Sequence, residues 1–261
     1  MALDVLVKSC KKSFDGKEKW NIVKELVANT EKKLLRALLI RQDFDSGATC
    51  LHYVTKSKDL ELFQAVFHGN PEAFDISDNQ KQSVLNYASK FSGKEINQWV
   101  EDNYLQNVAL KKTATQSSTI DDDQSYFGED FACVASLAVD GNTVGRHDDP
   151  CTVSYTQLEY NPWWQVDLED FFDIQMIRVY NRADTNFDQL KNFKVRVLQT
   201  FKDGNAKLVW ESEEQIVAPR PFITLSPPRG TNGNVVRITR VHPEEGNLVL
   251  SEVQVWSVKT P

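Results

Sequence analysis

The spacing of apolar residues changes once along this chain, and that change constrains the fold more than any other feature. Up to about residue 104, apolar residues recur three or four positions apart, as Val23 and Val27 do. Past residue 107 they alternate with polar residues, as over residues 193–197. The first spacing suits one face of a helix, whereas alternation suits a strand with one buried face. We therefore predict a helical domain over residues 1–104 and a β-domain over residues 107–258.

Length and composition allow both domains to fold. The 261 residues fit two domains of modest size, and 41% hydrophobic with 26% charged residues is ordinary for a globular protein. The formal net charge of -7 argues against a nucleic-acid surface, because phosphate binding needs clustered Lys and Arg. No apolar stretch approaches the roughly 18 residues that a membrane-spanning helix needs. We predict two cores, no nucleic-acid partner and no transmembrane segment.

The helical part holds an internal repeat. Leu51 and Tyr53 recur as Leu85 and Tyr87, each 34 positions later. A repeat of that length is typical of a solenoid of helix pairs. The run Gly-Ala-Thr-Cys-Leu-His over residues 47–52 resembles the turn that opens an ankyrin repeat, although the second copy has Lys and Asn in place of its Gly and His. Each repeat must bury its face on a neighbour. A unit with only two or three repeats is therefore expected to pack against the β-domain or a partner.

Turn signals separate the strand-like runs of the second part. Asp203-Gly-Asn and Asn232-Gly-Asn both fall between alternating segments. This arrangement favours an antiparallel sandwich or jelly roll. The predicted fold class is therefore α+β and multidomain, with an N-terminal α-helical, ankyrin-like domain followed by an antiparallel β-sandwich.

Five short motifs occur in order through the second part: Asn107-Val-Ala-Leu110, Ala138-Val-Asp-Gly-Asn142, Asn161-Pro-Trp-Trp-Gln-Val-Asp-Leu168, Asn181-Arg-Ala-Asp184 and Ser251-Glu-Val-Gln-Val-Trp256. Together they resemble the discoidin family of β-sandwich binding modules, and the second and third look most like the F-type lectins, or fucolectins. That family binds fucose, holds a structural calcium ion and does not catalyse. The resemblance implies a discoidin-type jelly roll in which Trp163 and Trp164 largely pack in the core.

A calcium site is predicted at the second motif. Asp140 and Asn142 lie two apart in a Gly-containing turn, which lets their side-chain oxygens converge with backbone carbonyls on a hard cation. The resemblance adds Glu252 from the last strand and the backbone of Ala138 and Ser251. The alternative is an ordinary Asp-Gly-Asn turn that is hydrogen-bonded to Glu252. Calcium at this site is expected to be structural.

A sugar site is predicted from the resemblance. F-type lectins bind fucose through a His, an Arg in an Arg-x-Asp motif and a further basic residue. The matching candidates are His147, Arg182 with Asp184, and Lys191. However, His147 lies about ten residues further from Arg182 than the family places it, and Gln189 occupies the expected basic position. The alternatives are an exposed loop histidine and an ion pair between Arg182 and Asp184 that holds its own loop.

The four cysteines, Cys10, Cys50, Cys133 and Cys151, lack metal-binding or redox spacing, so we predict buried free thiols. F-type lectins typically join a Cys near the position of Cys151 to one in the final strand. Here that second position is Ser251, so the resemblance implies that the family disulfide cannot form. Free thiols fit a reducing compartment.

The sequence shows neither a secretion signal nor a catalytic motif. The N-terminus lacks the basic start and apolar core of a secretory signal, and no Asn-x-Ser/Thr sequon occurs. The sequence holds no nucleophile with its base, no phosphate-binding glycine loop and no His-Glu-x-x-His metal helix. We therefore predict a protein that is not an enzyme and is intracellular and cytoplasmic, with a cilium or another large assembly as its setting.

Two functional hypotheses follow. The main one is a scaffold: a non-catalytic docking subunit of a larger intracellular assembly, which binds protein partners through both domains. The alternative is a calcium-dependent lectin that binds glycans of the fucose type. Glycan binding that is lost on changing Arg182 to Ala would favour the lectin.

Overall fold

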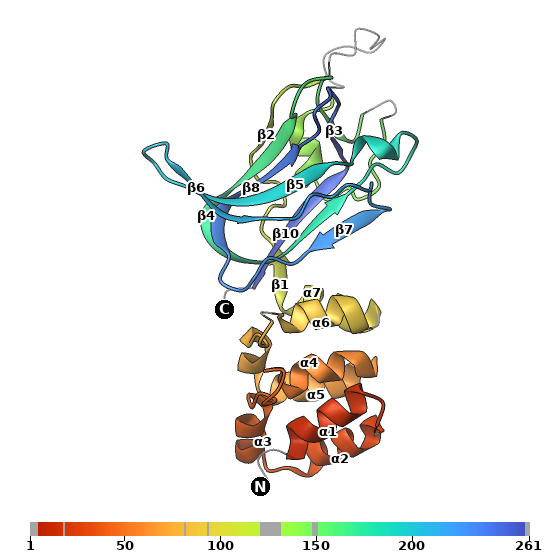
Figure 1. Ribbon diagram of the computed structural model, residues 1–261, viewed down its shortest axis with the longest axis vertical. Helices are drawn as coiled ribbons and strands as arrows, with labels where there is room; N and C mark the ends of the chain where they lie inside the picture. Colours follow the sequence, from red (N-terminus) through yellow and green to blue (C-terminus); the bar gives the residue numbers. More distant parts are fainter. Residues whose placement is uncertain are drawn as a thin grey trace. The chain divides into compact units, whose positions relative to one another are not determined.

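The computed structural model describes residues 5–17, 19–80, 82–92, 94–120, 132–147 and 151–258. The chain divides into two compact units, Met1–Leu105 and Gln106–Pro261 (Figure 1). The first unit is helical and the second is built mainly of strands. Each unit has buried apolar residues of its own.

The first unit consists of short helices: α1 (Val5–Phe14), α2 (Trp20–Asn29), α3 (Lys32–Leu39), α4 (Cys50–Val54), η2 (Thr55–Ser57), α5 (Leu60–Gly69), η3 (Pro71–Asp75), α6 (Val84–Phe91) and α7 (Lys94–Asn103). Within it α1 packs on α2, α4 on α5 and α6 on α7, and Figure 1 shows these pairs as successive layers. Among the described helices, none is both long and apolar enough to span a membrane.

The two copies of the 34-residue repeat have matching hydrogen bonds at the N-termini of α4 and α6. Thr49 N donates to His52 Nδ1 at 3.1 Å before α4, and Ser83 N donates to Asn86 Oδ1 at 2.7 Å before α6. Both are capping contacts, in which the third helical side chain accepts from the N-cap backbone. Asn can therefore replace His because it offers an acceptor at the same place. Burial lowers the pKa of His52 to about 4, and its Nε2 lies 3.2 Å from Gln82 O in the next copy.

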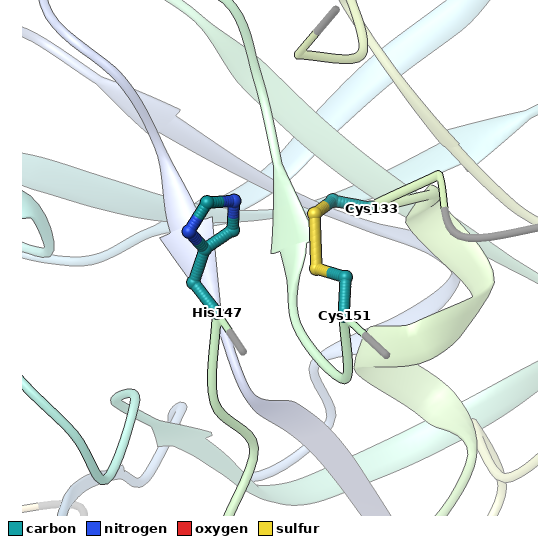
Figure 2. Close-up of side chains that lie close together, drawn as sticks. All are labelled: Cys133, His147 and Cys151. Atoms are coloured by element: carbon teal, nitrogen blue, oxygen red, sulfur yellow. A yellow bond between two sulfur atoms is a disulfide. The ribbon is translucent and has the colours of Figure 1, made fainter. Parts of the chain in front are cut away.

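The structure contains disulfides where free thiols are predicted. Cys10 in α1 is bonded to Cys50 at the start of α4, and Cys133 is bonded to Cys151. Figure 2 shows the second bond beside His147. The prediction is wrong because these partners, 40 and 18 positions apart, meet only in the folded chain. Local spacing carries no sign of either pairing.

The second unit contains these strands and single turns: β1 (Leu105–Asn107), β2 (Ala114–Gln116), η5 (Ala135–Val139), β3 (Ser154–Tyr155), β4 (Trp163–Tyr180), η6 (Phe187–Gln189), β5 (Phe193–Thr200), β6 (Ala206–Glu211), β7 (Phe222–Leu225), β8 (Asn232–Arg240), β9 (Val249–Leu250) and β10 (Glu252–Val258). The main sheet has the order β1-β10-β4-β8-β5-β6, with β2 and β7 also paired to β4, and β3 pairs with β9. Strand β4 pairs antiparallel with β2, β7, β8 and β10, and the pairs β5–β6, β5–β8 and β3–β9 are antiparallel as well.

Strand β4 belongs to both layers of the sandwich. Its first part pairs with β2 and β8, and its second part pairs with β10 and β7. The pairing register with β8 shifts between Asp167 and Phe172, where an irregularity lets a strand bend. Apolar side chains from both parts of β4 meet those of β5, β8 and β10 in one core. The predicted antiparallel β-sandwich is confirmed.

The two adjacent tryptophans have different environments. Trp164 is fully buried, and its Nε1 donates to Ala135 O at 2.9 Å. Trp163 is half-buried, and its ring lies 4.6 Å from Arg237 Cζ. Neighbouring strand residues point to opposite faces, so one ring packs in the core while the other stays outside it.

Candidate functional site

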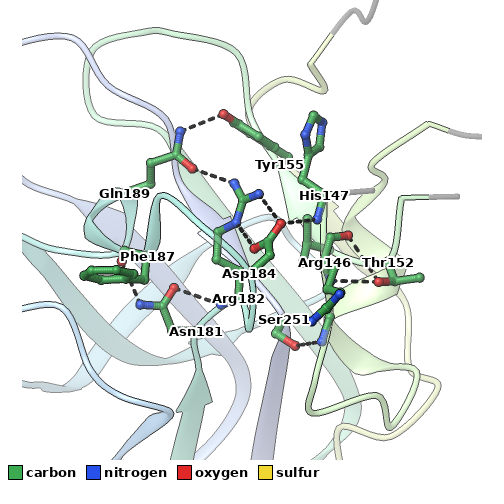
Figure 3. A network of polar contacts seen from close by, with 12 residues as sticks. Arg146, His147, Thr152, Tyr155, Asn181, Arg182, Asp184, Phe187, Gln189 and Ser251 are labelled. Carbon is green, nitrogen blue, oxygen red and sulfur yellow. Dashed lines mark hydrogen bonds and ion pairs between the residues drawn. The ribbon is translucent and has the colours of Figure 1, made fainter. Parts of the chain in front are cut away.

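The loop before β3 is pinned by close backbone contacts. Gly145 N donates to Ser251 Oγ at 2.7 Å. Thr152 N donates to Arg146 O at 3.0 Å, and Arg146 N donates to Thr152 Oγ1 at 2.8 Å, which closes the neck of the loop. A Cβ on Gly145 would lie 2.4 Å from Thr152 O, so only glycine fits without a shift. The neck places His147 at the edge of a polar network (Figure 3).

Arg182, just after β4, is the centre of that network. Its side chain is 3% exposed. Its Nε and Nη2 donate to the two carboxylate oxygens of Asp184 at 2.5 Å each, and its Nη1 donates to Gln189 Oε1 at 2.9 Å. The hydrogen bond from Arg182 is the main cause that lowers the pKa of Asp184 to about 2. The guanidinium is therefore held in one orientation by a carboxylate that stays ionised.

An aromatic pair borders the guanidinium. Gln189 Nε2 donates to the hydroxyl of Tyr155 in β3 at 2.7 Å, and the Tyr155 ring centroid lies 6.0 Å from Arg182 Cζ. The His147 ring meets the Tyr155 ring edge-on with centroids 5.0 Å apart, and His147 N donates to Asp184 at 3.0 Å. The structure thus brings His147, Arg182 and Asp184 together.

The residues of this network differ from the predicted sugar-site residues. Lys191 lies outside the network, and its 43% exposed side chain contacts Asp188 at 3.7 Å. Gln189, which stands at the position where the family has a basic residue, occupies the place beside Arg182. Tyr155 was not among the candidates. The resemblance offered one indirect signal, because it places the family histidine about ten residues closer to Arg182 than His147 lies, which is near Tyr155 in the sequence.

This network suits hydroxyl groups better than charged ligands. The charges of Arg182 and Asp184 compensate each other. A guanidinium carries five N–H groups, and the bonds to Asp184 and Gln189 use three of them. The Tyr155 hydroxyl accepts from Gln189, which leaves its own proton free to donate. A few fixed hydrogen-bond donors of no net charge beside an aromatic ring are typical of small-molecule binding sites.

A second group of acidic and amide side chains surrounds the Asp140 turn. Asp140 Oδ1 accepts from Asn142 N at 2.7 Å, and Asn142 Oδ1 accepts from Val144 N at 3.1 Å. Gly141 N donates to Glu252 Oε2 at 3.2 Å. Ser251 Oγ donates to Asn142 O at 3.2 Å. The turn that follows η5 therefore meets the start of β10. Both the predicted calcium site and its alternative, an ordinary turn hydrogen-bonded to Glu252, require this contact.

Glu252 is the unusual member of this group. Its side chain is fully buried, and among the described residues its Oε1 has no hydrogen-bond partner. Burial raises its pKa to about 7; the N–H of Gly141 partly offsets this, and the charge of Asp140 adds to it. A buried carboxylate with an unpaired oxygen is costly unless a cation or proton neutralises it. Oxygen donors of this kind fit a hard cation such as calcium.

Comparisons with known proteins concern the β-sandwich. A family model described as a NedA-like, galactose-binding domain of F5/F8 type C matches residues 137–220. Fucolectin-3 of Anguilla japonica is 28% identical over 158 residues, which are 60% of this chain and 82% of that protein. The fucolectin of Anguilla anguilla is 31% identical over 102 residues, which are 38% of this chain and 60% of that protein.

A solved structure of a Streptococcus pneumoniae fucose binding module is 27% identical, with a TM-score of 0.48, and the match covers 59% of this chain and 99% of that one. The family model and the fucolectin sequences support a galactose-binding-like, fucolectin-type domain in the C-terminal part of the chain. These relatives are named as fucolectins, and the family model is described as a galactose-binding domain. The matches favour the lectin hypothesis over the main hypothesis of an intracellular scaffold.

Proposed function

We propose that this chain is a non-catalytic carbohydrate-binding protein whose β-sandwich binds a fucose-type sugar at the Arg182 network. The observation that carries the proposal is the guanidinium of Arg182, which Asp184 and Gln189 orient beside the ring of Tyr155. The resemblance of the sandwich to fucolectins supports the same ligand class.

The chemistry of a deoxyhexose matches these groups. Its ring hydroxyls can accept hydrogen bonds from the remaining N–H groups of Arg182 and from the Tyr155 hydroxyl. Its methyl group and C–H edge can pack on an aromatic face. Because Gln189 stands where the family has a basic residue, the site has a lower positive charge than the family pattern implies, and it should not require an acidic sugar.

Calcium is proposed as a structural ion in this domain. The side chains of Asp140, Asn142 and Glu252, with backbone of Ala138 and Ser251, would hold it. The unpaired buried oxygen of Glu252 supports this assignment. The ion would supply positive charge to neutralise Asp140 and Glu252, and it would fix the turn after η5 against β10. Because Ser251 also holds Gly145, that order extends to the loop bearing His147.

A direct test compares two variants by glycan array and by titration calorimetry with fucose. Tyr155→Phe removes one hydroxyl and keeps the ring, so affinity should fall about tenfold, corresponding to one hydrogen bond of about 1.4 kcal/mol. Lys191→Ala is the matched control, because Lys191 lies outside the network, and its affinity should match the wild type. Absence of binding by the folded wild-type protein at millimolar sugar would refute the proposal.

The helical unit supports a second, protein-binding role. We propose that it is ankyrin-like, on the basis of its stacked helix pairs and its two matching capping turns. The observation that favours a partner is Phe44, which is 98% exposed in the turn between α3 and α4. Aromatic residues, Phe included, are enriched at the cores of protein interfaces, so this exposed ring is a candidate contact residue. Phe44→Ser should abolish co-purification of a specific partner without lowering the melting temperature; partner recovery equal to wild type would refute this role.

A further inference from the structure

A third cluster of chemically reactive side chains lies at the same end of the sandwich. Cys133, His147 and Cys151 each place one potential metal ligand atom within 4.8 Å of the other two (Figure 2). Cys133 is buried, and the other two side chains are partly buried. This group shares no residue with the Asp140 turn and Glu252, so it is separate from the proposed calcium site, and its one residue in common with the Arg182 network is His147.

The backbone positions two of these ligands before any ion arrives. The reciprocal hydrogen bonds between Arg146 and Thr152 place their neighbours, His147 and Cys151, side by side across the neck of the loop. His147 N is also tied to Asp184 at 3.0 Å. Ligands on a pinned backbone lose little freedom on binding, and such pre-organisation strengthens a site.

The imidazole of His147 is available as a ligand. Among the described residues, neither of its ring nitrogens makes a hydrogen bond, and the ring meets the edge of the Tyr155 ring with centroids 5.0 Å apart. Its peptide N–H, and not its ring, makes the bond to Asp184. The ring is partly buried, and one of its nitrogens lies within 4.8 Å of both disulfide sulfur atoms; after reduction these sulfurs and the imidazole would be the ligand types of a zinc site.

We propose that Cys133, His147 and Cys151 bind a zinc ion when the disulfide between the two cysteines is reduced. A dithiol reductant supplies two electrons: the S–S bond breaks, each sulfur takes one proton, and the reductant becomes a disulfide. Zinc then displaces both thiol protons to solvent as two Zn–S bonds form. The two states exclude each other, since the same sulfur atoms make both.

The distances allow this exchange. A tetrahedral zinc ion, with sulfur at about 2.3 Å and nitrogen at about 2.0 Å, holds its ligand atoms about 3.5 to 3.8 Å apart. The ligand atoms of the three side chains now lie within 4.8 Å of one another, so the ring of His147 has to move on the order of 1 Å. The two sulfur atoms have to separate once their bond is broken. Two thiolates and an imidazole favour zinc over calcium or magnesium. Water would complete the coordination.

The residues around the cluster are compatible with both the disulfide and the reduced, zinc-bound form. Val153, Tyr155 and Val249 pack with the cysteines in a small apolar cluster, which limits access of solvent. In an oxidising compartment the disulfide links the two segments. In a reducing one, such as the predicted cytoplasm, zinc would link the same two segments through His147 as well. This inference does not depend on sugar binding.

The test uses cobalt(II) as a spectroscopic substitute for zinc. The background variant carries Cys10→Ser and Cys50→Ser, which remove the other disulfide and leave only Cys133 and Cys151. After reduction, this variant should bind one equivalent of cobalt, with a thiolate charge-transfer band that zinc abolishes. The oxidised form should show no band. Adding Cys133→Ser should eliminate the band, and His147→Gln should weaken binding at least about tenfold.

If the reduced sandwich stays folded, either of two results would overturn the proposal. One is a reduced background variant that keeps its native circular dichroism but shows no cobalt–thiolate band. The other is unchanged affinity in His147→Gln, because the cysteines would then bind without the imidazole. If reduction unfolds the sandwich, zinc should restore the native spectrum, and failure to restore it would also count against the site.

Discussion

Replacing Cys10 and Cys50 by Ala should destabilise the helical unit by about 4 kcal/mol. The disulfide closes a loop with a sequence separation of 40, and the chain-entropy relation assigns a loop of that length about 4 kcal/mol at 25 °C. Both residues are fully buried, and Ala keeps the site apolar. The loss is therefore dominated by the greater freedom of the unfolded chain.

The magnitude is large for a unit of this size. Domains are stable by about 5 to 15 kcal/mol, so the variant should lose a substantial share of its stability. For about 100 residues, each kcal/mol corresponds to roughly 4 to 8 °C, which gives a fall in melting temperature of roughly 15 to 30 °C. The matched variant with Cys133→Ala and Cys151→Ala opens a loop with a separation of 18, so the sandwich should lose about 3 kcal/mol.

The assay is urea unfolding followed by hydrogen exchange and mass spectrometry, which reports each unit through its own peptides. In the first variant the midpoint of peptides from α4 and α5 should fall; in the second, the midpoint of peptides from β4 should fall. An unchanged midpoint for the helical peptides of the first variant would refute the reasoning. Peptide mapping without reductant provides the control that both bonds form in the wild type.

Three further outcomes follow from individual side chains. In the presence of a chelator, ionising the buried Glu252 opposes folding, because its pKa is raised to about 7; relative to Glu252→Gln, the wild type should lose up to about 3 kcal/mol between pH 4.5 and 7. Chemical denaturation at pH 5 and pH 8 measures this, and a pH-independent difference between the two proteins would contradict it. Gly145→Ala should cost about 1 to 3 kcal/mol because its Cβ would clash with Thr152 O, and an unchanged melting temperature would argue against that clash. Trp164→Phe should destabilise the fold more than Trp163→Phe, since only the first breaks a buried hydrogen bond; equal losses in thermal unfolding would show otherwise.

The sequence by itself determined the class of each unit. Alternation over residues 193–197 predicted a strand with one buried face, and β5 has that burial pattern. The spacing of Val23 and Val27 predicted a buried helix face, and both are buried in α2. These patterns could be interpreted without the fold because they depend on residues only two to four positions apart. The capping side chains of α4 are equally local.

Only the tertiary structure decided which distant residues meet. Glu252 lies beside Gly141 across a sequence separation of 111, and the resemblance to a family, not the spacing, suggested that contact. The disulfide partners of Cys10 and Cys151 had no local signature. Tyr155 joins Arg182 through Gln189 because β3 and the loop after β4 converge. Periodicity fixes which face of an element is buried, whereas contacts between elements depend on how the whole sandwich closes around its core.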